Sequence, residues 1–317
     1  MDLAKIVELR LQVEPPPDVP IARSFLTNIY DGILETCSFR KGLEHQSELI
    51  ASVILTQPQQ MRFGYPEPIV ILLIHPEYPH ARDWVAQTLK ELSPQLGTSC
   101  SMEMHATDKE LVPLIQQIGF GISKLDLIGD VSVAIKHLEG KTIDPTVLGI
   151  RFEPLTAALI PEVNQMISDF FVAHPEFGWG GQVVSKEQQQ KINRREENRI
   201  LQQITEYPES NFAIYKDDRI VGNFGFMPNP GNPFFGNCGG MNIILLPEIQ
   251  GMGVGKAAYL KVTKTMKSMN LDWLIGRTSN PGVLKIGHQV GRRVRRYLFR
   301  KEGPFIDPKH ISALSEC

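Results

Sequence analysis

The residues whose types and spacing point most directly to chemistry form a glycine-rich stretch, Gln250-Gly251-Met252-Gly253-Val254-Gly255-Lys256. The apolar run 243–246 before it predicts a buried strand, and the periodicity of 251–269 predicts a helix after it. Backbone N–H groups at a helix N-terminus lack intrahelical partners and, with the helix dipole, favour an anion. Glycine lets a ligand approach the backbone closely, and Lys256 adds a positive charge. The stretch therefore predicts a phosphate-binding site.

The spacing of the glycines disfavours two common nucleotide-binding loops. A Walker A loop needs glycine, four residues and then Gly-Lys-Ser/Thr, but this chain has Gln250 at the first glycine and Ala257 at the hydroxyl position. A dinucleotide-binding loop needs Gly-x-Gly-x-x-Gly, whereas Gly251, Gly253 and Gly255 are all two residues apart. The stretch does not predict a nucleotide triphosphatase or a Rossmann site.

The same stretch resembles the pyrophosphate loop of the GNAT superfamily of acyl-CoA-dependent N-acetyltransferases. That loop has the pattern Gln/Arg-x-x-Gly-x-Gly/Ala, which Gln250, Gly253 and Gly255 meet, and Asn280 falls where the family has an asparagine after its fifth strand. The resemblance covers residues from 148 to about 303. It implies that acetyl-CoA is the acyl-donor substrate, that no metal is needed, and that the following residues bind it: Ile243, Ile244, Leu245, Gln250, Gly251, Met252, Gly253, Val254, Gly255, Lys256 and Asn280.

Both features also have a purely structural interpretation. The glycines could form a tight connection from strand to helix with no ligand, although three glycines beside a lysine exceed what a turn requires. Asn280 could cap a helix that begins at Pro281. A cap and a ligand contact are compatible, so both interpretations of Asn280 stay open.

The resemblance implies that a primary amine attacks the thioester carbonyl directly, in a ternary complex and without a covalent enzyme intermediate. The family's usual proton donor and base are missing, because Gly287 stands at the tyrosine position and Ile275 at the base position. The catalytic candidates are His288, which could move a proton near neutral pH, and Tyr297. Cys238 is a further candidate. His288 could instead be an exposed helix residue. Because Gly287 and Ile275 replace both standard groups, a non-catalytic CoA-binding sensor or scaffold module is the alternative function.

Glu176 and Trp179 are candidates for binding the acceptor amine. They lie in the segment 174–181, which combines aromatic residues, a carboxylate and glycines, and which the resemblance puts between the first two helices, near the acceptor. An aromatic ring attracts a cation, and a carboxylate does so too. A plain connecting loop is the alternative. The sequence identifies neither the acceptor, a small-molecule or peptide amine, nor the oligomeric state.

The elements that must position these residues predict an α/β fold of the layered α+β kind. From residue 148 the pattern gives strand, two helices, three strands, helix, strand, helix and strand, with a Pro/Gly/Asn-rich loop at 228–240. The polar segment 138–147 predicts a domain boundary near Asp144. We expect two tandem GNAT-like domains, 1–144 and 145–317, each with a mixed, mostly antiparallel central sheet flanked by helices.

The two halves share an internal repeat. An offset of 171 residues aligns 71–78 with 242–249, so that a Pro-Glu pair coincides, and an offset of 172 puts Asp108 on Asn280. A repeat of this length indicates two domains of like fold in tandem.

The phosphate-binding loop is lost in the first copy. Arg82 and Trp84 stand there at the positions of two loop glycines, and Pro79 has no N–H to donate. We therefore expect the first domain to be degenerate and to bind no cofactor.

Composition predicts a globular cytoplasmic protein. Of the 317 residues 42% are hydrophobic and 21% are charged, and the longest uncharged apolar run, 69–74, is far shorter than the roughly 20 residues that a membrane helix needs. The first ten residues carry charges where a signal peptide is apolar. The four cysteines are scattered without a C-x-x-C pair, which favours free thiols over disulfides or a zinc site.

Charge divides the chain into an acidic and a basic part. Residues 1–145 hold 12 basic and 19 acidic residues, a net charge of −7, and residues 146–317 hold 21 basic and 16 acidic, a net charge of +5. The densest basic run, between 292 and 301, could be a solvated strand or could contact the CoA 3′-phosphate or an acidic partner. Nucleic-acid binding is disfavoured, because no aromatic residues are interleaved to stack on bases.

Overall fold

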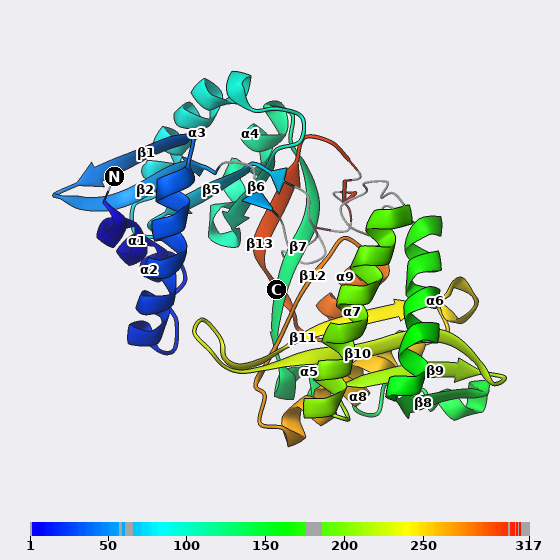
Figure 1. The fold of residues 1–317 in the computed structure, drawn as a ribbon. Coiled ribbons are helices and arrows are strands. Elements are labelled where there is room, and N and C mark those ends of the chain that lie inside the picture. The colour runs from blue at the N-terminus through cyan, green and yellow to red at the C-terminus, as the bar shows by residue number, and fades with distance from the viewer. Residues whose placement is uncertain are drawn as a thin grey trace. The chain divides into compact units, whose positions relative to one another are not determined.

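The computed structural model describes residues 2–56, 59–60, 66–174, 186–303, 305–307, 309 and 311, which form two compact units (Figure 1). Unit 1 comprises Met1–Asp126, Asn232–Gly236 and Val294–Asp307; unit 2 comprises Leu127–Gly231, Asn237–Arg293 and Pro308–Cys317. The units are therefore interleaved along the chain. The boundary near Asp144, which separates the two sequence repeats, stays a prediction.

Unit 2 is a mixed sheet with helices on both faces. Its elements are the end of β7 (Gly121–Asp130), α5 (Val131–Leu138), β8 (Ile150–Pro154), α6 (Ile160–Ala173), α7 (Lys186–Glu206), β9 (Asn211–Lys216), β10 (Arg219–Asn232), β11 (Gly236–Leu245), α8 (Val254–Ser268), β12 (Trp273–Thr278) and α9 (Pro281–Gln289). The strand order is β7-β12-β11-β10-β9-β8. The β8–β9 and β9–β10 pairs are antiparallel, and β11–β12 is parallel. The predicted fold class is confirmed.

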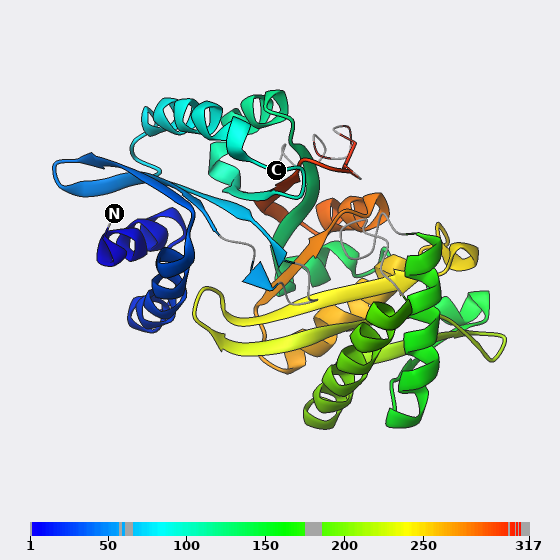
Figure 2. The same ribbon diagram turned by 45° about the horizontal axis from the view of Figure 1, so that its top comes forward.

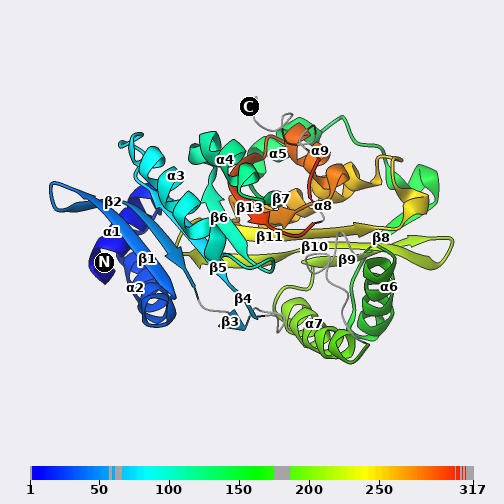
Figure 3. The ribbon, with the colours of Figure 1, turned by 90° about the horizontal axis from the view of Figure 1, so that it is seen from above.

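The two faces of this sheet carry separate cores. Helices α6 and α7 lie on one face, and α5, α8 and α9 lie on the other (Figure 3). Along β9, Phe212 and Ile214 enter the core beneath α8, while Ala213 enters the core beneath α6 and α7. This alternation is the period of two that a strand imposes. Helix α8 buries Val254, Ala258, Val262 and Met266, which recur every four residues and so share one helix face.

Unit 1 is also a sheet between helices. Its elements are α1 (Leu3–Val13), α2 (Val19–Thr36), β1 (Phe39–His45), β2 (Glu48–Leu55), β5 (Ile69–Ile74), α3 (Ala81–Leu92), β6 (Ser101–His105), α4 (Val112–Gln117), the start of β7 and β13 (Arg293–Arg300) from Val294 onward, with two-residue strands β3 (Gln59–Gln60) and β4 (Pro66–Glu67). The strand order is β1-β2-β5-β6-β13-β7. Helices α1 and α2 lie on one face, and α3 lies on the other (Figure 2).

The two units repeat one feature of topology. In unit 1, β5 and β6 pair in parallel over only three residues, Ile69–Ile71 with Ser101–Glu103. In unit 2, β11 and β12 also pair in parallel over only three, Cys238–Gly240 with Trp273–Ile275. In both units a helix follows the first of the two strands, α3 after β5 and α8 after β11. The arrangement is consistent with two GNAT-like domains.

The expectation of a loop over 228–240 is wrong. Strand β10 continues to Asn232 and β11 begins four residues later, so the segment is a hairpin. The Asn232 side chain makes the turn, because its Oδ1 accepts hydrogen bonds from the N–H groups of Phe234 (2.9 Å) and Phe235 (3.1 Å). The prolines of this segment wrongly indicated a loop. Strand β10 pairs with β9 only up to Gly225, so the prolines after it interrupt no part of that ladder.

Candidate functional site

The glycine-rich loop joins the end of β11 to the start of α8. A short 3-10 helix, Pro247–Ile249, turns the chain after the strand, and the N–H of Leu246 still bonds to the Val221 carbonyl of β10 (3.0 Å). The Gln250 side chain then reaches back, and its Nε2 donates to the Leu245 carbonyl at 2.7 Å. Gln250 thus fixes the loop to the strand end, which explains a glutamine at this position without any ligand.

The loop leaves backbone donors without partners. Gly251 and Gly253 have φ of 77° and 87°, a left-handed conformation that favours glycine. Gly253 is the N-cap residue of α8 and supplies no side chain to cap the helix. Among the described residues, no acceptor pairs with the N–H groups of residues 251–255. A Cβ on Gly251 would meet nothing within 4 Å. The loop is therefore an open set of donors at a helix N-terminus.

Gly255 has a different role from the other two glycines. A Cβ at this position would lie 2.8 Å from Cδ1 of Ile286 in α9 and 3.5 Å from Cδ1 of Leu245. Glycine here lets α8 and α9 approach closely. Lys256, the next residue, is half-buried, and its N–H bonds to the Gly253 carbonyl at 3.1 Å. Sequence spacing detected the loop but could not separate the packing glycine from the open ones.

The neighbouring strands separate next to the loop. The last residue pair of the β11–β12 ladder is Gly240 with Ile275, although β11 runs on to Leu245 and β12 to Thr278. Ile243 and Ile244, in the unpaired part, are half-buried. The unpaired edges face each other beside the loop, so a linear ligand bound at the loop could continue between the strands.

Asn280 caps α9. Its Oδ1 accepts hydrogen bonds from the N–H groups of Gly282 (2.8 Å) and Val283 (3.3 Å), and its own N–H bonds to Oγ1 of Thr278 (3.0 Å). The helix-cap interpretation is therefore correct. The cap occupies Oδ1 and leaves Nδ2 available to donate, so a ligand contact stays a prediction.

The catalytic candidates are spread over the molecule. His288 lies in the last turn of α9 and is half-buried, and the neighbouring Gly287 is buried. Tyr297 lies in unit 1, in β13, where it pairs with Met104, and burial raises its pKa. Cys238 lies buried in β11, where desolvation raises the pKa of its thiol to about 11. A catalytic role for His288 or Tyr297 stays a prediction; Cys238 is poorly suited to proton transfer at neutral pH.

The acceptor candidates Glu176 and Trp179 lie outside the described residues. His174, at the start of the same segment, follows α6. The centroid of its ring lies 4.9 Å from the centroid of the Phe170 ring.

The basic run beyond residue 291 is partly buried, since Arg292 is buried, Arg295 and Arg296 are half-buried and Arg293 is exposed. Arg292 is buried at 3% exposure, so the interpretation of the run as a solvated strand does not hold for this residue. In unit 1, Arg295 pairs with Glu14 (2.7 Å) and Asp126 (2.8 Å), and Arg296 pairs with Glu14 (2.8 Å). These three arginines make their contacts within the protein and do not form an open basic surface. No periodicity in the sequence indicated that they would be buried or half-buried.

The start of α3 in unit 1 differs from the loop before α8. The N–H groups of Ala81, Arg82 and Asp83 bond to the carbonyls of Tyr78 (2.9 Å), Pro79 (3.1 Å) and His80 (3.2 Å) in turn. The first backbone donors of this helix are therefore already satisfied, whereas those of α8 are not.

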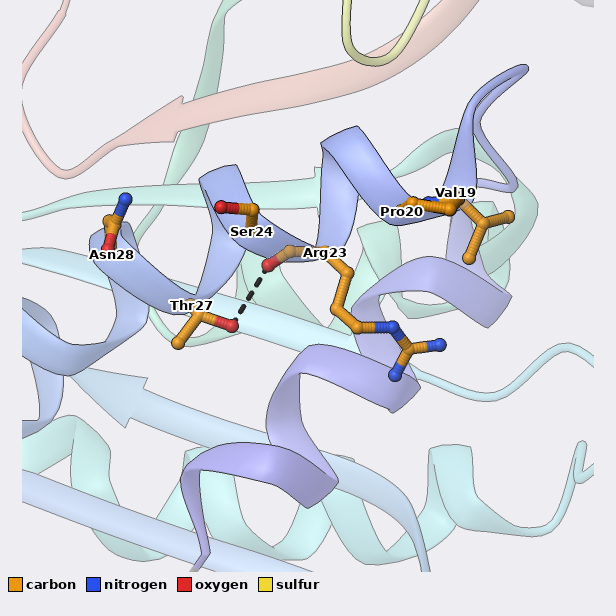
Figure 4. A pocket seen from close by; sticks show the side chains of 6 residues that line it. All are labelled: Val19, Pro20, Arg23, Ser24, Thr27 and Asn28. Carbon is orange, nitrogen blue, oxygen red and sulfur yellow. Dashed lines mark hydrogen bonds between the residues drawn. The ribbon is translucent and has the colours of Figure 1, made fainter.

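A shallow pocket lies on the outer face of α2 in unit 1 (Figure 4). It is lined by Val19, Pro20, Arg23, Ser24, Thr27 and Asn28, all from this one helix. Thr27 donates through Oγ1 to the Arg23 carbonyl at 2.9 Å, the back-bond of a helical threonine.

Within the described part of the chain no group of three or more His, Cys, Asp or Glu residues could hold a metal ion, and no helix is long and apolar enough to cross a membrane.

Comparison with known proteins finds one family model that matches within the second half of the chain. The model of the Acetyltransferase (GNAT) family matches residues 175–285, which include β11, the glycine-rich loop, α8 and most of α9. A GCN5-related N-acetyltransferase from Sphaerobacter thermophilus has a similar structure, with 15% identity, 96% of this chain and 94% of that chain covered, and a TM-score of 0.56. A GNAT-family acetyltransferase from Colwellia psychrerythraea aligns with 12% identity over 87% of this chain and 95% of that chain, at a TM-score of 0.47. Among curated proteins, none matches at a significant level.

Proposed function

We propose that this chain, an acyltransferase whose residues 175–285 belong to the Acetyltransferase (GNAT) family, transfers an acetyl group from acetyl-CoA to a primary amine. The observation that carries the proposal is the set of N–H groups at 251–255, which pair with no acceptor among the described residues and which glycines of positive φ hold at the N-terminus of α8. A diphosphate accepts several hydrogen bonds and is attracted by the helix dipole. Acetyl-CoA supplies an acyl group already activated as a thioester.

Each part of the site has a task in this proposal. The amides of 251–255 hold the diphosphate, Lys256 adds charge, and Gln250 keeps the loop against the strand. The extended arm of the donor lies along Ile243, Ile244 and Leu245, where β11 has parted from β12. The Leu245 N–H polarises the thioester carbonyl. Nδ2 of Asn280 donates a hydrogen bond to the extended arm of acetyl-CoA. These residues position the reactants and exclude water.

The remaining assignments belong to the same proposal. Residues 145–317 carry the site, and 1–144 are a degenerate copy whose helix α3 has its first N–H groups already bonded. Glu176 and Trp179 contact the cationic acceptor, a small-molecule or peptide amine. We place the protein in the reducing cytoplasm, in keeping with the thiols of Cys37 and Cys238, which form no disulfide among the described residues.

Thermal shift with a charge variant tests the loop. Gly251→Glu puts a carboxylate beside the loop, where it repels the diphosphate, and its Cβ meets no heavy atom within 4 Å. Gly231→Glu is the matched control, because Gly231 also has positive φ (67°) and open space but lies in the β10–β11 hairpin. Acetyl-CoA should raise the melting temperature of the wild type and of Gly231→Glu, and not that of Gly251→Glu. Equal shifts in all three would refute the site.

A second candidate is a module that binds CoA without transferring the acyl group. It is favoured by Gly287 and Ile275, which put no ionisable group on α9 or β12 at the two positions where the resemblance expects one. Thiol release during incubation of acetyl-CoA with a panel of amines distinguishes the candidates. Release that depends on the amine supports the enzyme, whereas tight binding without release over a broad panel supports the module.

A further inference from the structure

Arg292 is a buried cation whose hydrogen-bond partners among the described residues are uncharged. Its side chain lies in unit 2, where Nη1 donates to the Tyr259 hydroxyl (3.1 Å) and Nη2 donates to the carbonyls of Leu127 (3.0 Å) and Gly276 (3.4 Å). Among the described residues no carboxylate pairs with it, and its Nε is buried without a hydrogen-bond partner. Carbonyl and hydroxyl dipoles solvate the guanidinium but leave its full positive charge in place.

The charge lies where β11 and β12 begin to separate. A Cβ on Gly276 would be 3.1 Å from Arg292 Nη2 and 3.4 Å from the Met241 carbonyl oxygen. Met241 and Gly276 are the first residues after the last pair of the ladder, so the guanidinium sits at the closed end of the separation. Gly129 gives the side chain room, since a Cβ on this glycine would lie 2.7 Å from Cγ of Arg292.

A buried positive charge at this place favours an anion at the inner end of the cleft. In a site of low polarity an opposite charge within a few ångströms lowers the pKa of an acid by one to about three units. Two atoms of the proposed reactant gain negative charge during transfer: the carbonyl oxygen, which the Leu245 N–H polarises in the proposed function, and the departing sulfur. We propose that Arg292, oriented by Tyr259, stabilises the CoA thiolate as it departs. This inference rests on the proposed function.

The step balances without a protein acid at the sulfur. The amine nitrogen forms a bond to the acyl carbon, the C–S bond breaks, and sulfur leaves with the bonding pair as a thiolate. The proton of the attacking amine goes to water. Arg292 acts in this step through its positive charge and transfers no proton. A stabilised thiolate removes the need for a proton donor at buried Gly287.

The direct test is titration of bound CoA in the wild-type protein. Ultraviolet absorbance of the thiolate, followed against pH, gives the pKa of the bound and the free thiol in the same buffer. We expect the bound pKa to be lower by about one unit or more. Binding of desulfo-CoA is measured alongside, because it reports on the loop without the sulfur. Failure of desulfo-CoA to bind contradicts the proposed function; binding of both ligands with an unlowered thiol pKa overturns the role of Arg292 alone.

Three variants extend the test. Arg292→Gln should raise the bound thiol pKa to at least the free value, whereas Arg292→Lys should keep most of the lowering. Tyr259→Phe, which removes only a hydroxyl, covers the case in which the arginine variants do not fold, and it should shift the pKa part of the way. Arg151→Gln is the control for net charge, because Arg151 is exposed on β8 and pairs with Glu153 and Asp218. A shift as large in the control would overturn the proposal.

Discussion

In unit 1, Nε of Arg82 lies 3.1 Å from Oδ1 of Asp108 and ties the first turn of α3 to the 3-10 helix that follows β6. Arg82 also reaches Glu110 (3.0 Å) and donates to the Thr107 carbonyl (3.2 Å). Asp108 is 2% exposed, and burial raises its pKa while Arg82 acts against that rise. In the sequence repeat these two residues correspond to a loop glycine and to Asn280, so the pair stands where unit 2 has its candidate site.

We predict that one chain binds one CoA. In unit 2 the loop amides are unpaired, but in unit 1 the amides of Ala81 and Arg82 are bonded to carbonyls and the Arg82 side chain is held by Asp108. Isothermal titration should give a stoichiometry near one, which Gly251→Glu should abolish. A second equivalent that survives this substitution would show that unit 1 has kept a site.

Removing Arg82 should destabilise the protein. Arg82→Ala leaves the Asp108 carboxylate buried without its main partner, and loss of one member of a buried pair costs about 3 kcal/mol. Asp108→Asn in the same background removes the unpaired charge and should recover part of that loss. Urea denaturation of the two single variants and the double variant measures the coupling. Additive effects would mean that the pair contributes nothing as a pair.

Much of unit 2 could be predicted from its sequence, because apolar runs and glycine spacing indicated the strand, the glycine-rich loop and the helix. The tip of the β10–β11 hairpin and the burial of Arg292 could not be predicted. The residues of a hairpin turn made by the Asn232 side chain have the same composition as a loop. The burial of an arginine that is solvated by distant carbonyls leaves no pattern along the chain. A side-chain hydrogen bond within the turn decided the first case, and a contact between residues far apart in sequence decided the second.

Stability should depend on pH through His105. Desolvation is the main cause that lowers its pKa from 6.5 to about 4, with Arg296, Arg10 and Arg295 acting in the same direction and Glu14 against them. Between those values the unfolded chain binds more protons than the folded one, so stability is complete above pH 6.5 and falls as the pH drops towards 4. The loss is at most about 3 kcal/mol.

Comparison of wild type with His105→Asn isolates this contribution. Unfolding free energies measured by urea from pH 7 to pH 4 should fall less steeply in the variant than in the wild type. Carboxylates titrate mainly below this window, and the pKa of Glu14 is held low by its arginines despite its burial. Parallel curves for the two proteins would show that His105 does not titrate in this range.

Cys238 should resist alkylation. Its thiol is buried in β11, its pKa is raised to about 11, and its sulfur donates to the Asn229 carbonyl at 3.6 Å. Since the thiolate is the reactive form, iodoacetamide at pH 8 should leave the Cys238 peptide unmodified while half-buried Cys37 reacts. Peptide mass mapping reads out both sites. Modification of Cys238 at the rate of Cys37 would mean that β11 opens in solution.

Packing of α8 against α9 depends on Gly255. In Gly255→Ala the new methyl group would lie 2.8 Å from Cδ1 of Ile286, so the isoleucine must move, at a cost of about 1–3 kcal/mol. Ile286→Val removes that methyl group, and the double variant should therefore be more stable than Gly255→Ala alone. Gly255 lies in α8 and has no positive φ, so backbone strain does not complicate the comparison. Thermal melts of the two single variants and the double variant measure the coupling. If the double variant is no more stable than Gly255→Ala, a residue other than Ile286 sets the spacing of the two helices.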